Sequence, residues 1–253
     1  MSRRVSVVKS FRKAVLSLTA LLPILAVVGV RPAEVAASSS VKAFVPVTPV
    51  RLMDTREIGS ISFGHNENRD LQVSGVSPVP VAAVAVSLNV TVTGPTSDGY
   101  LTIWPAGSTK PVVSNLNFVS GETVPNLVTI GVGTNGRISI APFLYQLTGE
   151  VDVIVDVVGW YAAGFNPINP TRIMDTRNGV NGVRLAPGEV RTLRIEGSSG
   201  LPASPIGSVA LNVTAVNPTS DAGYLTIWPS GLEMPTASSL NFVAGETLSL
   251  IHI

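Results

Sequence analysis

Residues 84–92 read Val-Ala-Val-Ser-Leu-Asn-Val-Thr-Val, and this stretch decides the fold class. A large aliphatic residue stands at every second position, with small or polar residues between. Successive side chains of a β-strand point to opposite faces of a sheet, so this period of two predicts a strand with one buried face. Residues 151–158, Val-Asp-Val-Ile-Val-Asp-Val-Val, predict a second long strand in the same way.

Shorter strands are expected along the rest of the chain. Gly, Pro, Asn and Asp separate them, as in 95–99 and 133–136, and no stretch beyond the first forty residues shows helical periodicity with caps. Many short strands joined by turns indicate an antiparallel sandwich or jelly roll rather than a parallel sheet. The further strands expected are 69–73, 99–104, 114–118, 126–132, 137–140 and 209–215.

The chain also contains two copies of one pattern. The offset between them grows from 121 to 124 residues, as expected when loops accept insertions and strands do not. A period of this length suits an independently folding domain rather than a solenoid unit. The matching stretches are 51–56 with 172–177, 88–91 with 211–214, 99–105 with 223–229, 116–118 with 240–242, and 121–123 with 245–247.

We therefore predict an all-β protein of tandem antiparallel β-sandwich or jelly-roll-like modules, the second truncated, preceded by a helical signal peptide. Residues 44–164 are named the first copy and residues 165–247 the second copy. The junction around Gly164 is short, so the two copies are expected to touch.

The last six residues, Leu-Ser-Leu-Ile-His-Ile at 248–253, do not match the residues that come after Thr123 in the first copy. They are the translation of CTG TCT CTT ATA CAC ATC, the start of a common transposase sequencing adapter. We interpret 248–253 as adapter translation and expect the gene to continue differently. The second copy would then lack the strands that correspond to 124–158 and would expose apolar faces.

The first 37 residues resemble an export signal. A basic start is followed by Ala14–Val30, which carries no charge, and then by small residues with a cleavage site expected before Ser38. Residues 38–43 are a linker. The alternatives are a retained membrane anchor, although the apolar stretch falls just under spanning length and contains Pro23, and export by the twin-arginine route.

Removing residues 1–37 changes the charge. The remaining chain carries 11 basic and 15 acidic side chains, a net charge of −4, so no basic patch for nucleic acid remains. The chain has no cysteine, which excludes thiol catalysis and cysteine-ligated metals. We expect a secreted or extracellular protein, and association with the cell wall is one form of this expectation. Contact with the membrane is expected only through the signal peptide during export.

The ordered motifs resemble a repeated module of secreted actinobacterial proteins. These motifs are Arg-Leu-Met-Asp-Thr-Arg, Leu-Asn-Val-Thr, Gly-Tyr-Leu-Thr-Ile-Trp-Pro, Ser-Asn-Leu-Asn-Phe, Val-Pro-Asn and Asp-Val-Val-Gly-Trp-Tyr, and the resemblance covers nearly all of residues 44–247. It implies an extracellular accessory module, found in tandem or beside cell-wall hydrolases and peptidases, with no catalytic residue to carry over. The first copy departs from the family pattern at 62–67, and Trp160 replaces the family's usual tyrosine.

Two groups of residues are candidates for ligand binding. In the Asp-Thr-Arg motif, an aspartate with its flanking arginines could bind a ligand, but we favour an ion pair that fixes the first strand and the loop after it. Tyrosine and tryptophan on one face of the 99–104 strand could stack on sugar rings, but we favour packing. The candidates are Arg51, Asp54, Arg56, Arg172, Asp175, Arg177, Tyr100, Trp104, Tyr224 and Trp228.

The residue inventory argues against catalysis, metals and cofactors. His65 is the only histidine outside the last six residues and has no counterpart in the second copy, so no triad or histidine zinc site is expected. Asp98 and Asp221 lie in turns and offer too few oxygens for calcium. Asp152 and Asp156 alternate onto one strand face, which we interpret as solvated. The sequence predicts no catalytic, metal or cofactor site.

The expected function is non-catalytic. The leading hypothesis is a module that binds envelope polysaccharide or a surface protein, or that acts as a spacer. The alternative is an accessory region of a longer secreted hydrolase, a peptidase or cell-wall hydrolase, whose catalytic domain lies outside this sequence.

Overall fold

The computed structural model describes residues 4–10, 44–198, 200–203 and 206–252. Within them the chain is all-β, with several antiparallel sheets. The only helical turn there is the 3-10 turn Thr134–Gly136, and these described residues contain no helix long and apolar enough to cross a membrane. The apolar segment Ala14–Val30, expected to be a helical signal sequence, and the linker 38–43 lie outside the described residues.

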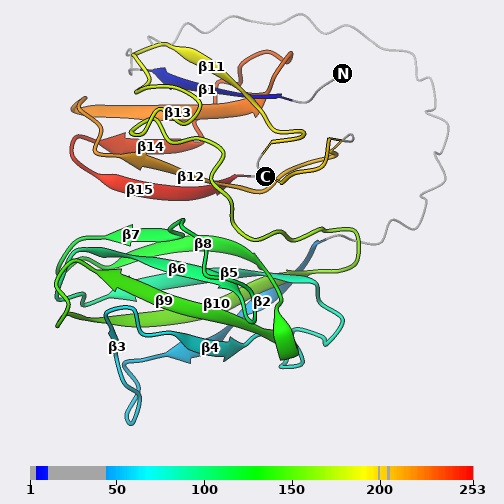
Figure 1. Cartoon of the computed structure of the whole chain (residues 1–253), viewed down its shortest axis with the longest axis vertical. Coiled ribbons are helices and arrows are strands. Elements are labelled where there is room, and N and C mark those ends of the chain that lie inside the picture. Colours follow the sequence, from blue (N-terminus) through cyan, green and yellow to red (C-terminus); the bar gives the residue numbers. More distant parts are fainter. Residues whose placement is uncertain (1–3, 11–43, 199, 204–205, 253) are drawn as a thin grey trace, which may run out of the picture.

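The first copy forms two antiparallel sheets, drawn together in the lower part of Figure 1. One sheet has the order β2-β10-β5-β8 and the other β4-β9-β6-β7, while the two-residue strand β3 pairs with the start of β10. The strands are β2 Phe44–Asp54, β3 Phe63–Gly64, β4 Arg69–Gln72, β5 Ala85–Thr93, β6 Gly99–Pro105, β7 Leu116–Phe118, β8 Val124–Gly131, β9 Arg137–Leu144 and β10 Glu150–Tyr161. The strands expected inside this copy are confirmed to within a few residues.

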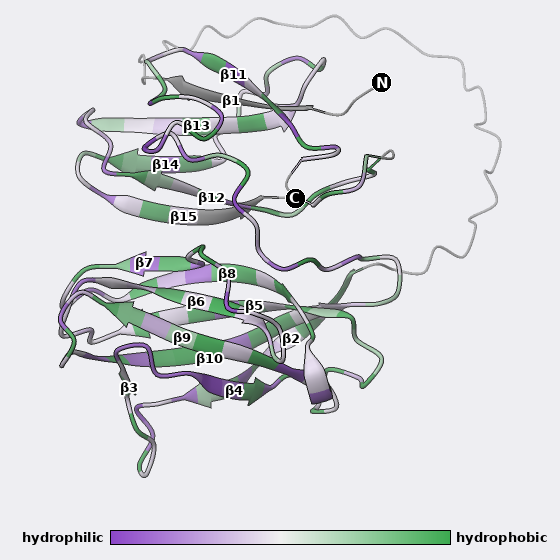
Figure 2. Ribbon diagram, viewed as in Figure 1, coloured by the Kyte–Doolittle hydropathy of each residue, from purple (hydrophilic) through white to green (hydrophobic). Residues whose placement is uncertain are grey.

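The alternating residues of these strands build the core. Val86, Leu88, Val90 and Val92 of β5 are all fully buried. The same hydrophobic cluster takes in residues of the other sheet, including Ile103 of β6. Figure 2 shows the hydrophobic residues spread along β5, β8 and β10, with polar positions between them. Burying every second side chain on a shared interior is the condition that fixes strand register.

The second copy also forms two groups of strands, together with one strand from the N-terminus (Figure 1). Their orders are β11-β1-β13-β14 and β12-β15. The strands are β1 Arg4–Ser10, β11 Val190–Arg194, β12 Leu211–Val216, β13 Ala222–Pro229, β14 Leu240–Val243 and β15 Thr247–His252. Its buried cluster is smaller, with Ala215, Leu225, Ile227, Leu240 and Phe242 at the centre.

The segment Leu248–His252 forms most of β15, although its sequence does not match the first copy. It pairs with β12 in the register in which β8 pairs with β5: Ala215 lies opposite Leu248 as Val92 lies opposite Val124. Backbone pairing requires compatible spacing rather than identical residues, and Leu-Ser-Leu alternates as a strand does.

The start of the second copy behaves differently from the start of the first. Phe44–Asp54 is strand β2, an edge strand whose only partner in its sheet is β10. The equivalent stretch 165–174 has a similar sequence, with both prolines kept, but contains no strand. No strand equivalent to β10 is present in the described part of the second copy, so this stretch has no ladder to join.

Candidate functional site

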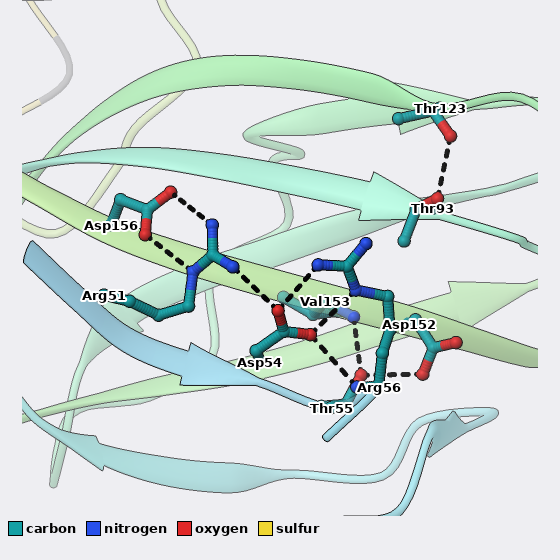
Figure 3. Close-up of polar contacts among 9 residues, drawn as sticks. All are labelled: Arg51, Asp54, Thr55, Arg56, Thr93, Thr123, Asp152, Val153 and Asp156. Atoms are coloured by element: carbon teal, nitrogen blue, oxygen red, sulfur yellow. Dashed lines mark hydrogen bonds and ion pairs between the residues drawn. The ribbon is translucent and has the colours of Figure 1, made fainter. Parts of the chain in front are cut away.

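The Asp-Thr-Arg motif lies at the end of β2, and Figure 3 shows its polar contacts. Arg56 donates from Nε to Asp54 Oδ1 at 2.8 Å and from Nη2 to Asp54 Oδ2 at 2.7 Å. The backbone N–H of Arg56 adds a third bond, to Oδ1 at 3.1 Å, and Arg51 Nη1 adds a fourth, to Oδ2 at 2.9 Å. These four donors fill the acceptor sites of one carboxylate.

The surroundings of Asp54 stabilise its charged form. Its side chain is only 4% exposed, whereas those of Arg51 and Arg56 are about half exposed. The hydrogen bonds from the Arg56 side chain, with smaller contributions from the Arg56 backbone and the charge of Arg51, hold the pKa of Asp54 well below its usual range, against the opposing effect of desolvation. A carboxylate held in this way is a poor proton acceptor at neutral pH.

Arg51 also connects the motif to β10. Its Nε donates to Asp156 Oδ1 at 2.9 Å and its Nη2 to Asp156 Oδ2 at 3.3 Å. The hydrogen bonds to Asp156 raise the pKa of Arg51. Asp156, whose side chain is 20% exposed, is bound to an arginine rather than part of a purely solvated face, which corrects our interpretation of this strand.

Thr55 makes the second connection to β10. Its hydroxyl donates to Asp152 Oδ1 at 2.8 Å and accepts from the N–H of Val153 at 2.9 Å. Ser62 donates to the same Asp152 oxygen, also at 2.8 Å. Asp152 is thus engaged by the loop after β2, and each polar residue of the motif has a partner within the protein. A shallow open hollow beside the motif is lined by Thr55, Glu57, Gly59, Glu67 and Arg69.

The second copy repeats the arrangement around Asp175. Arg177 donates from Nε to Oδ1 at 3.0 Å, from Nη2 to Oδ2 at 2.8 Å and from its backbone N–H to Oδ1 at 3.0 Å, and Arg172 Nη1 also donates to Oδ2. Arg177 lowers the pKa of Asp175 well below its usual range. The motif thus folds on its own residues, because it forms here without a strand equivalent to β10.

The two aromatic candidates of β6 lie in different environments. Trp104 is 3% exposed, and its Nε1 donates to the Ser108 carbonyl at 3.2 Å, while Lys110 Nζ lies 5.8 Å from the centre of its ring. Trp228 is 8% exposed and donates in the same way to the Leu232 carbonyl. Each tryptophan is therefore covered by the loop that follows its strand, as the packing alternative expects.

Tyr100 instead belongs to an aromatic group that the sequence alone does not reveal. Its ring stacks on Phe143, with centres 5.1 Å apart, and Phe143 meets Tyr145 and His65 edge-on at 5.6 and 4.8 Å. We name His65, Tyr100, Phe143 and Tyr145 the aromatic group. Tyr145 is 69% exposed, whereas burial raises the pKa of Tyr100. Phe143 lies directly opposite Tyr100 in the β6–β9 pair, so the group can be found only when the strand pairing is known.

The second copy has no such group among its described residues. Tyr224 is equivalent to Tyr100, but its neighbour across the β1–β13 pair is Ser10, which has no ring. Among the described residues the aromatic group is therefore found in the first copy and not in the second, unlike the aspartate motif.

Metal binding has no centre in the parts of the chain that the structure describes. No group of three or more histidine, cysteine, aspartate or glutamate side chains lies close enough together to hold an ion there. Asp98 uses Oδ1 to accept the backbone N–H of Ser120 at 2.8 Å, which fixes the turn before β6. Family models, curated proteins and solved structures all return no match to this chain.

Proposed function

We propose that this chain is a secreted, non-catalytic protein of tandem β-sandwich modules that binds envelope polysaccharide at the cell surface. The non-catalytic part of this proposal is supported by Asp54, whose carboxylate accepts four hydrogen bonds from within the protein. Four donors of its own motif occupy the carboxylate, and Asp175 is occupied likewise, so the most suggestive acidic residues serve the loop in both copies.

The aromatic group supports the binding part. Sugar rings carry apolar C–H faces that stack on aromatic side chains, and an exposed tyrosine beside stacked rings offers such a surface. Tyr145 is the exposed member, and Phe143 and Tyr100 stand behind it in contact. A long saccharide requires an open surface rather than a deep pocket, which suits this position after the end of β9.

Sedimentation of the full chain with insoluble cell-wall polysaccharide tests the proposal. Tyr145→Ala should weaken binding about tenfold, the loss expected when one aromatic contact of roughly 1.4 kcal/mol is removed. Leu147→Ala is the matched control, because Leu147 is 72% exposed in the same loop and carries no ring. Equal binding by both variants, or no binding by the unaltered chain, would refute polysaccharide recognition at this group and leave binding to a surface protein or the spacer role.

The accessory region of a longer secreted hydrolase stays the second candidate. It predicts that a catalytic domain follows in the complete gene, whereas further repeats would favour the binding module. Sequencing the complete gene separates the two.

A further inference from the structure

Strands β1 and β9 hold the same position in their two sheets. In the first copy, Ser139 of β9 lies opposite Asp70 of β4 on one side and Trp104 of β6 on the other. In the second copy, Ser6 of β1 lies opposite Thr192 of β11 and Trp228 of β13. Asp70 and Thr192 are equivalent, because each is the middle residue of an Arg-x-Leu sequence, at 69–71 and 191–193. The repeated Trp-Pro makes Trp228 equivalent to Trp104.

The agreement extends along the whole strand. Leu225 faces Lys9 as Leu101 faces Pro142, and Tyr224 faces Ser10 as Tyr100 faces Phe143. The sequences agree as well: residues 4–8 read Arg-Val-Ser-Val-Val, and residues 137–141 read Arg-Ile-Ser-Ile-Ala. The N-terminal segment thus repeats both the residue pattern and the register of β9, although it lies outside the tandem repeat.

The first copy shows why this pattern is required. Ile138 and Ile140 are fully buried in the core, so the two positions beside the serine must be aliphatic. Ser139 is 3% exposed and donates to Asp70 Oδ1 at 2.6 Å, so the position between Trp104 and the neighbouring strand takes a small polar residue. A strand that enters this position therefore needs alternating aliphatic residues around a serine.

The neighbouring strands β11 and β13 also need a backbone partner at this position. β1 is the strand that joins β11 to β13, and it pairs with both of them. Without it, β11 would have no partner and β13 would keep only β14, and each would present unpaired N–H and C=O groups. Such edges bind extended peptides by adding a strand to the sheet.

We propose that the space between β11 and β13 is a binding site for one extended peptide with the pattern Arg-aliphatic-Ser-aliphatic, and that Arg4–Ser10 occupies it in this chain. The ligand is a polypeptide strand, so the site goes beyond polysaccharide binding and does not depend on it. Cleavage before Ser38, the event expected of the export signal, separates β1 from the rest of the protein and empties the site.

Cysteine pairs in the full chain test the occupant, because the natural sequence has no cysteine. Ser6→Cys with Thr192→Cys should form a disulfide in air, visible as a shift on non-reducing gels. Ser6→Cys with Arg194→Cys, two residues out of register, should not. Asp70→Cys with Ser139→Cys is the equivalent pair in the first copy and serves as the positive control. A positive control that crosslinks while the Ser6 pair does not would overturn the proposal, as would equal crosslinking of the shifted pair.

Hydrogen exchange gives a second readout that needs no crosslink. Val7→Pro removes a backbone donor from β1 and should speed exchange of the Val190–Arg194 amides at least about tenfold, leaving Arg69–Gln72 unchanged. A synthetic peptide of residues 137–144 added to this variant should restore protection, and a scrambled peptide should not. Unchanged exchange in the variant, or equal protection by both peptides, would refute a selective strand site.

Discussion

Arg56 binds both carboxylate oxygens of Asp54, through Nε at 2.8 Å and Nη2 at 2.7 Å, from only two residues along the chain. Arg177 binds Asp175 with the same two atoms. Parallel two-point contacts between guanidinium and carboxylate are both strong and directional. The pair therefore fixes the bend of the chain after the aspartate in both copies, although strand β10 lies beside the motif only in the first copy.

This pair predicts a specific dependence of stability on pH. The pKa of Asp54 is lowered in the folded state, whereas in the unfolded chain it is about 3.9. The unfolded state then binds more protons at acid pH, so the contribution is complete above about pH 5 and is lost as the pH falls below about 4. Asp54→Asn should be less stable at pH 7 and should change less between pH 5 and pH 2, measured by thermal unfolding. Parallel profiles for variant and unaltered chain would contradict this.

Thr55 and Thr176 occupy the same motif position but should respond differently to substitution. Thr55 is buried and accepts the N–H of Val153, so Thr55→Val leaves that buried donor unsatisfied and should cost about 1–3 kcal/mol. The Thr176 hydroxyl has no such bond among the described residues, and Thr176→Val should stay within about 0.5 kcal/mol. Urea unfolding compares them, and equal losses would show that Thr55 acts through its shape alone.

Much of the strand pattern could be predicted from alternation, as at Ala85–Thr93 and Glu150–Tyr161, because burial on one face leaves a trace in a single sequence. The partners could not. Asp156 looks solvated in its own strand and is identified as a partner of Arg51 only when β2 and β10 pair. Phe143 joins Tyr100 through the β6–β9 pairing in the same way.

Strand formation itself also depends on partners. Phe44–Asp54 and 165–175 have similar sequences, and only the first is a strand, because β10 is beside it. Conversely, Arg4–Ser10 lies in a segment interpreted as an export signal and yet forms a strand between β11 and β13. Both outcomes depend on long-range pairing: the alternating pattern of residues 4–8 is visible in the sequence, but the strands it pairs with are not.

Gly99 and Gly223 should show different tolerance of a methyl group. A Cβ on Gly99 would lie 2.3 Å from the Phe143 carbonyl oxygen, a backbone atom held in the β6–β9 pair, so Gly99→Ala should cost about 1–3 kcal/mol. A Cβ on Gly223 would meet only the Phe242 ring, at 2.7 Å, which is a side chain rather than a paired backbone atom. Gly223→Ala should therefore cost less, by urea unfolding. A larger loss at Gly223 would show that the Phe242 ring is fixed.

Leu88 and Leu211 are equivalent residues of the two Leu-Asn-Val-Thr motifs but should respond differently to truncation. Leu88 is fully buried in β5 between β10 and β8, so Leu88→Ala leaves a cavity and should cost about 2–5 kcal/mol. Leu211 is only partly buried in β12, which pairs with β15 alone in its sheet, so Leu211→Ala should cost about 1 kcal/mol. Hydrogen exchange of the β5 and β12 amides assigns each loss to its own copy. Equal losses would mean that β12 is covered in solution by a further strand, in the place that β10 holds beside β5.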